Sequence, residues 1–199
     1  MDWLFKARQV YGLQILNYTV TSNHIHLLVL ADQRRMVIPR AMQLVAARTA
    51  WEYNHRKNRS GAYWEGAYCA TAVQDDHHLL ECMTYIDLNM VRAGVVRHPR
   101  DWRFGGYYEL LERKQRYCLI DLKALKRIMG VEDLDQLMRL HDILIDKTIE
   151  KRRLAREKRW TENVAVGDRS FMAAMNQKLG YKSDDAVAGN NTIDLDLNH

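Results

Sequence analysis

Apolar and polar positions follow two different periods near the start of the chain. Residues 2–11, DWLFKARQVY, carry apolar side chains at a spacing of three to four residues, which predicts an amphipathic helix. The runs 13–20 and 24–30 are strand-like, and the turn-forming TSN between them predicts an antiparallel hairpin. Because residues i and i+2 of a strand point to the same face, His24 and His26 are expected to lie side by side.

The pattern predicts further helices and one more strand up to about residue 110. A long helix is expected from near Pro39, followed by a polar and basic loop over 54–61. Residues 67–73, AYCATAV, predict a third strand. Asp75 is the expected N-cap of a helix that ends at Gly94. Together these elements predict an α+β fold.

The pattern changes near residue 119. From there to about residue 180 the spacing is helical and no strand pattern is present. The stretch 147–159, KTIEKRRLAREKR, holds seven basic residues against two acidic ones. The polar tail is expected to be flexible. We therefore predict a domain over 1–110, a separate helical extension over 119–180 and a flexible tail over 181–199.

Composition narrows the class of protein. Hydrophobic residues make up 47% of the 199 residues, which is enough for a sizeable core. A net charge of +5 and a pI near 9.1 suit an anionic partner such as nucleic acid, and also many ordinary basic proteins. Cys69, Cys82 and Cys118 form no disulfide framework or zinc motif, so the reducing cytoplasm is expected. No transmembrane stretch or signal peptide is recognisable, so no membrane partner is expected.

Tyr85 and Asn89 add candidate chemistry. They are four residues apart in the predicted helix and so share one face. A tyrosine hydroxyl, with a pKa of about 10, is a poor nucleophile at neutral pH, but a divalent cation can polarise a phosphodiester oxygen and assist its attack. Two imidazoles and an amide oxygen suit Mg²⁺ or Mn²⁺, and Mn²⁺ rather better. Taken alone, such a histidine pair is more often part of a polar sheet face, and such a tyrosine is more often a residue at the edge of the core.

At these residues the chain resembles the HUH-type single-tyrosine transposases, and among them the REP-associated tyrosine transposases. SNHIHLLV and TYIDLNMVRAGVV carry the resemblance, which covers roughly residues 1–110; the second stretch is the more specific. The resemblance implies that His24, His26 and Asn89 are metal ligands and that Tyr85 is the nucleophile. Met90 stands where the family often has proline. The implied fold is a ferredoxin-like antiparallel sheet with helices on one face.

The resemblance also implies a function. It predicts metal-dependent cleavage and transfer of single-stranded or hairpin DNA through a 5′-phosphotyrosine intermediate. The basic residues expected to contact DNA phosphates are Arg56, Lys57, Arg59, Arg92, Arg152, Arg153 and Arg156. One alternative is a truncated relative that binds hairpin DNA without cutting it. Another is an RNA-binding sheet, which should carry stacking aromatic residues where this chain has histidines.

The family's first strand is central in its sheet and precedes the helix that begins here at Asp2. No such strand is recognisable, so the chain looks amino-terminally truncated. The gap would leave unpaired backbone groups beside residues 24–30. We expect an unfilled groove, a strand borrowed from a partner in a homodimer, or direct pairing of 24–30 with 67–73. On each expectation the chain has little or no strand-transfer activity.

Overall fold

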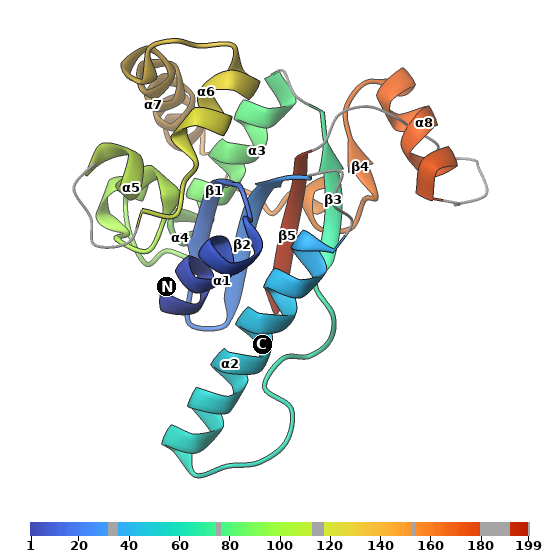
Figure 1. Ribbon diagram of the computed structural model, residues 1–199. Helices are drawn as coiled ribbons and strands as arrows, with labels where there is room; N and C mark the ends of the chain where they lie inside the picture. Colours follow the sequence, from blue (N-terminus) through green and yellow to red (C-terminus); the bar gives the residue numbers. More distant parts are fainter. Residues whose placement is uncertain (32–35, 75–76, 113–117, 153, 180–191, 199) are drawn as a thin grey trace.

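The computed structural model describes residues 1–31, 36–74, 77–112, 118–152, 154–179 and 192–198 (Figure 1). Its helices and strands, in chain order, are α1 (Asp2–Tyr11), β1 (Ile15–Val20), β2 (His24–Leu30), α2 (Val37–Lys57), β3 (Cys69–Val73), α3 (His77–Asp87), α4 (Asn89–Arg92), α5 (Gly106–Leu111), α6 (Leu122–Met129), α7 (Leu134–Glu150), β4 (Ala165–Val166), α8 (Arg169–Leu179) and β5 (Thr192–Asn198). Short 3₁₀ turns, η1 (Pro99–Asp101) and η2 (Lys158–Trp160), lie between them. The α+β class is confirmed.

The amino-terminal elements lie close to where the hydrophobic pattern places them. Helix α1 ends at Gly12, whose φ of 71° is the left-handed conformation that glycine adopts easily. Strands β1 and β2 form the predicted antiparallel hairpin. The expected N-cap Asp75 lies outside the described residues. The predicted helix that follows it is divided at Leu88 into α3 and α4.

Five strands form one sheet in the order β1-β2-β5-β3-β4. Strand β5 lies between β2 and β3 and pairs antiparallel with both. Its Asp196 is opposite His26 on one side and Cys69 on the other. The short pair β3–β4 is parallel. The carboxy-terminal segment therefore occupies the central position of the sheet.

This arrangement corrects the expectation of a flexible tail over 181–199 for residues 192–198, which form a strand; residues 181–191 and 199 lie outside the described residues. Residues 192–198, TIDLDLN, alternate apolar and polar positions, which is the period of a half-buried strand. None of the three outcomes expected for the edge of β2 occurs, because β5 provides backbone partners to β2 and β3 together. The reason for expecting an inactive chain is thereby removed.

Helices cover both faces of the sheet, where one covered face was expected. Helices α1 and α2 lie on one face and α3 on the other (Figure 1). On the α3 side, the Thr19 hydroxyl donates to the Ile86 carbonyl at 3.0 Å. Strand β2 explains the difference, since its nearly continuous apolar run from Ile25 is typical of a strand buried on both faces.

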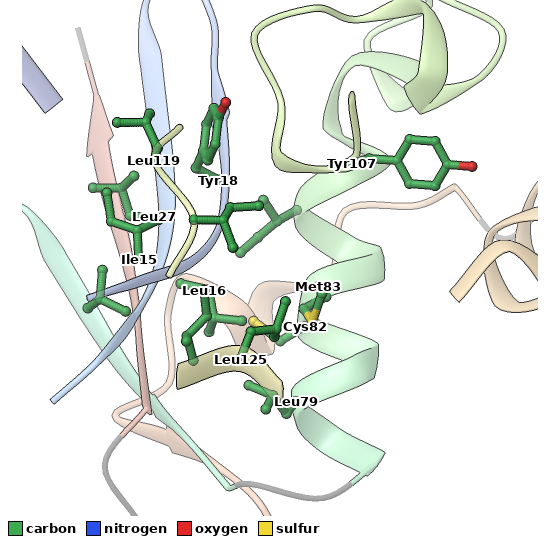
Figure 2. Close-up of a cluster of buried hydrophobic side chains, with 14 of the residues drawn as sticks. Ile15, Leu16, Tyr18, Leu27, Leu79, Cys82, Met83, Tyr107, Leu119 and Leu125 are labelled. Atoms are coloured by element: carbon green, nitrogen blue, oxygen red, sulfur yellow. The ribbon is translucent and has the colours of Figure 1, made fainter. Parts of the chain in front are cut away.

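The predicted extension shares its core with the predicted domain. Leu125 of α6 packs with Leu79 and Cys82 of α3 (Figure 2), and Ile120 forms an isolated β-bridge with Ile15. Strand β4 adds a further edge to the sheet, so the region after residue 119 is not purely helical. The two predicted parts are therefore held together by a common hydrophobic core.

A buried polar network also joins β1, α3, α5 and α7. The Asn17 amide donates to Asp87 Oδ2 at 3.0 Å, and the Tyr107 N–H donates to Asp87 Oδ1 at 3.2 Å. His141 Nε2 of α7 lies 3.2 Å from the same Asp87 Oδ2. Because Asp87 is fixed from three elements, the end of α3 has a defined position. Within the described residues, no helix has the length and hydropathy needed to cross a membrane.

Candidate functional site

A cavity of about 510 Å³ lies between the start of β2, the α3–α4 junction and the chain after α7. We call it the histidine cavity. Its lining residues are Thr21, Ser22, Asn23, His24, His26, Tyr85, Asn89, Met90, Arg92, Ala93, Val95, Leu154, Arg156 and Thr161. The four residues proposed from the sequence as ligands and nucleophile therefore lie around one space.

Strand geometry places the two histidines on the same face of β2. Their ring centroids are 6.0 Å apart and the ring planes differ by 25°. The His26 ring also lies edge-on to Tyr85, with 6.5 Å between centroids. The face that carries the histidines is therefore the face that α3 covers.

Burial keeps His26 uncharged. Its side chain is 4% exposed, and burial is the largest cause that lowers its pKa to about 3. The nearby charges of His24, Arg92 and Arg156 lower the pKa further. At neutral pH the imidazole of His26 therefore has a nitrogen lone pair, which a metal ligand requires.

Tyr85 is held between an arginine and a tryptophan. Arg92 Cζ lies 3.9 Å from the centroid of the Tyr85 ring, which is a close cation–π contact. The Trp160 ring packs against Tyr85 with 6.0 Å between centroids. Only 5% of Tyr85 is exposed. These contacts fix the ring of Tyr85, which lines the cavity.

Arg92 is a partly buried cation that lines the cavity. Burial lowers the pKa of its guanidinium from the usual value. Its Nη2 atom is buried and has no hydrogen-bond partner among the described residues. A buried, unpaired guanidinium nitrogen is costly unless an acceptor reaches it. A phosphate oxygen is an acceptor of the required charge.

Tyr85 and Asn89 share the cavity although the helix is interrupted between them. Leu88 has a ψ of 0°, outside the helical range, and Asn89 begins α4. The Leu88 N–H still donates to the Thr84 carbonyl at 3.0 Å, so the turn is preserved. The one-turn relation predicted for Tyr85 and Asn89 therefore survives the break.

The donor atoms of His24, His26 and Asn89 are of types that bind divalent cations. Two imidazole nitrogens and an amide oxygen match the mixed ligation that Mn²⁺ accepts. Among the described residues, no group of three or more His, Cys, Asp or Glu side chains is placed to hold a metal. Since the proposed donors carry no carboxylate and Arg92 and Arg156 line the same cavity, a cation bound there would need an anionic partner such as a phosphate.

The seven basic residues proposed to contact DNA fall into three groups. Arg92 and Arg156 line the histidine cavity. Arg56 and Lys57 are the last residues of α2, which extends beyond the sheet (Figure 1), and Arg59 follows the C-cap of this helix. Arg152 is exposed, with a φ of 48°, and Arg153 lies outside the described residues.

Sequence patterns do not identify the residues that enclose Tyr85 from the carboxy-terminal side. Trp160, Leu154 and Thr161 lie far from the histidine and tyrosine motifs in sequence. Trp160 is 1% exposed and belongs to the main core. Its only signal in the sequence is a large aromatic residue directly after a basic run, which is too common to predict such a contact.

Comparison with known proteins bears on the segment that carries the motifs. Residues 3–89 match a family model described as "Transposase IS200 like". This segment belongs to the IS200-like transposase family. Residues 90–199 lie outside the match, and neither a curated protein nor a solved structure matches the chain. For residues 3–89, the match confirms the sequence resemblance at the level of the transposase family, and it supports DNA as the partner.

Proposed function

We propose that this IS200-like transposase segment cleaves and rejoins single-stranded or hairpin DNA, with Tyr85 as the nucleophile, and that it is of the REP-associated type. The observation that carries the proposal is the common cavity of His24, His26, Tyr85 and Asn89. Because residues 3–89 match a transposase family, DNA is the substrate expected for that cavity.

The proposed step exchanges one phosphodiester bond for another. The Tyr85 oxygen bonds to phosphorus, and the bond from phosphorus to the 3′ oxygen of the neighbouring nucleotide breaks. The phenol gives up its proton and the leaving oxygen takes up one, so a 5′-phosphotyrosine and a 3′-hydroxyl result. Attack by another 3′-hydroxyl reverses the step and joins the DNA to a new end.

The residues around Tyr85 favour this chemistry. Arg92, over the ring at 3.9 Å, favours the negative charge that develops on the phenol oxygen. Its unpaired Nη2 is a donor for a phosphate oxygen. His24, His26 and Asn89 would hold Mg²⁺ or Mn²⁺, which as a Lewis acid polarises a phosphate oxygen.

A non-cleaving protein that only binds hairpin DNA is the alternative. It would use the same basic cavity but would form no covalent bond. Since β5 fills the central position of the sheet, the structural reason for preferring this alternative is absent.

Covalent capture separates the two functions. The purified chain is incubated with labelled hairpin DNA that has an unpaired flank, in the presence of Mn²⁺, and the products are separated under denaturing conditions. We expect a protein–DNA band from the wild type, and none from Tyr85→Phe. Tyr68→Phe is the matched control, because Tyr68 does not line the histidine cavity, and it should behave as the wild type. DNA binding without any band would establish the non-cleaving alternative.

A further inference from the structure

A second cavity, also about 510 Å³, adjoins the histidine cavity. Tyr85 and Arg92 line both cavities. The remaining walls come from α3, from α7 and from residues 155–159. We call this space the α3–α7 cavity. Its volume lies within the range of roughly 300–1,000 Å³ that is typical of small-ligand pockets.

The two cavities differ in charge. Among the described residues, the histidine cavity is lined by two arginines and by no aspartate or glutamate. The α3–α7 cavity is lined by Glu81 and Glu157 as well as by Arg92 and Arg159. Arg159 is paired with both glutamates, Nη1 at 3.2 Å from Glu81 and Nη2 at 2.7 Å from Glu157. Phosphate therefore suits the histidine cavity, and an uncharged group suits the α3–α7 cavity.

Hydrogen-bond acceptors line the α3–α7 cavity alongside its two arginines. The Thr84 hydroxyl donates to the Leu80 carbonyl at 2.8 Å, and the Thr148 hydroxyl donates to the Leu144 carbonyl at 2.7 Å. With their hydrogens engaged, both oxygens can only accept further bonds. The glutamate oxygens are also acceptors. A ligand with N–H donors matches this lining.

Apolar and planar groups complete the walls. Leu88, Leu144 and Ala155 contribute apolar surface. The Arg159 guanidinium is held flat by its two glutamates and lies 4.4 Å from the centre of the Trp160 ring. Arg159 and the aromatic residue Tyr85 line the cavity, and unpaired nucleic-acid bases stack on guanidinium groups and on aromatic rings of this kind.

We propose that the α3–α7 cavity binds the base of one unpaired nucleotide next to the phosphodiester that Tyr85 attacks, and that it prefers a base with an exocyclic amino group over thymine. This inference rests on the proposed function, because Tyr85 is the shared wall. A phosphate held in the histidine cavity places the adjoining nucleotide at that wall. Adenine, cytosine and guanine carry the amino donor that the lining accepts, and thymine lacks it.

Equilibrium binding to the Tyr85→Phe full-length chain tests the proposal without cleavage. The probes are labelled hairpins whose unpaired flank is adenine or thymine, and adenine flanks in which one abasic site is moved along. We expect one flank position at which the abasic site weakens binding about tenfold. We also expect the thymine flank to bind more weakly than the adenine flank.

Substitutions made in the Tyr85→Phe chain test whether the base binds in the α3–α7 cavity. Leu144→Trp fills the cavity and should weaken the binding of intact DNA. It should cause no further loss of affinity for DNA that already carries the abasic site at the sensitive position. Leu140→Trp, on the same helix at a position that is 48% exposed, is the matched control and should bind normally. If Leu144→Trp fails to fold, Thr148→Val keeps the shape, removes the hydroxyl acceptor and should reduce the preference for adenine.

The outcomes separate this proposal from the cleavage reaction. Equal binding of all flanks, an equal effect of Leu144→Trp on intact and abasic DNA, or no measurable DNA binding would overturn the base pocket. Base-selective binding by a chain whose wild type forms no covalent adduct would retain the pocket and overturn only the cleavage.

Discussion

Residues 1–112 contribute both histidines, Tyr85 and Asn89 to the site, whereas residues 118–198 contribute groups that enclose and support them. From the second region, Arg156 lines the histidine cavity and Trp160 packs against the Tyr85 ring. The same region places β5 beside the histidine strand. The candidate chemistry is thus encoded within short local motifs, while its enclosure depends on residues distant in sequence.

The family assignment rests on the first region alone. The family match covers only residues 3–89, which hold the four proposed reactive residues. The walls from the second region lie outside the match. Both regions are therefore expected to be necessary, and the predictions below test the contacts and charges that the second region contributes.

Deleting Thr192–His199 should have the largest effect. Strands β2 and β3 would each lose a pairing partner, and each buried backbone group left without one costs about 1–3 kcal/mol. The sum is comparable to the whole stability of a domain, roughly 5–15 kcal/mol. Urea unfolding and hydrogen exchange of the β2 amides should show a largely unfolded or aggregated chain.

A peptide of residues 192–198 added to the truncated chain is the control, since it can pair with the open edges. It should restore protection, and the same peptide with Leu195→Pro should not, because proline removes a backbone donor from the middle of the strand. Unchanged stability of the truncated chain would show that β5 is dispensable.

Trp160→Ala should come next. Truncation of a buried tryptophan costs about 3–5 kcal/mol, and here it also removes the ring that supports Tyr85. The midpoint temperature of thermal unfolding and the rate of covalent capture should both fall. Trp51→Ala, at a position that is 60% exposed, should change the free energy of unfolding by no more than about 0.5 kcal/mol. A Trp160 variant as stable and fast as the wild type would contradict the supporting role.

The buried contact of Asp87 with His141 predicts a pH effect on stability. Burial raises the pKa of Asp87 to about 8 and lowers the pKa of His141 to about 4. The folded pair therefore keeps one proton between these values. In the unfolded chain, with pKa values of about 3.9 and 6.5, the pair also binds one proton up to pH 6.5 but none above it.

It follows that the pair adds no pH dependence from about pH 4 to 6.5. Above about pH 6.5, up to pH 8, it lowers the free energy of unfolding by as much as about 1.4 kcal/mol per pH unit, because the folded state binds the extra proton. Urea titrations across this range measure the slope. Asp87→Asn should abolish it and Asp101→Asn, at an exposed site, should not. A slope that survives Asp87→Asn would belong to other groups.

The smallest effect is expected from single surface cations. Arg156→Gln should weaken binding of single-stranded DNA and reduce the slope of log affinity against log salt by about 0.7, the value for one phosphate contact. Arg56→Gln removes the same charge at the far end of α2, away from both cavities. Equal slopes for the two variants would show that binding does not depend on the histidine cavity.

Local patterns were sufficient to predict much of the first region. The β1–β2 hairpin follows from two strand-like runs and a turn, and the spacing of His24 and His26 places them on one face. Tyr85 and Asn89 are related by one helical turn, which the break at Leu88 leaves nearly unchanged. These arrangements involve residues close together in the sequence, so they follow from local secondary structure and do not depend on the rest of the fold.

The position of β5 could not be predicted in the same way. Its alternating residues, from Ile193 to Leu197, stand in a polar tail, and the partners that bury a central strand are far away in sequence. The contact of Trp160 with Tyr85 likewise depends on the path of α7 and the chain after it. Long-range pairing is decided by which open edge remains to be filled, and periodicity alone does not encode that choice.

Locating the covalent bond tests the central claim most directly. The wild-type chain is reacted with hairpin DNA and Mn²⁺, digested with protease and nuclease, and its peptides are analysed by mass spectrometry. The account predicts a nucleotide attached through its 5′-phosphate to the peptide that contains Tyr85, and to no other tyrosine. A nucleotide on a different residue, or a chain that binds this DNA but yields no modified peptide, would contradict it.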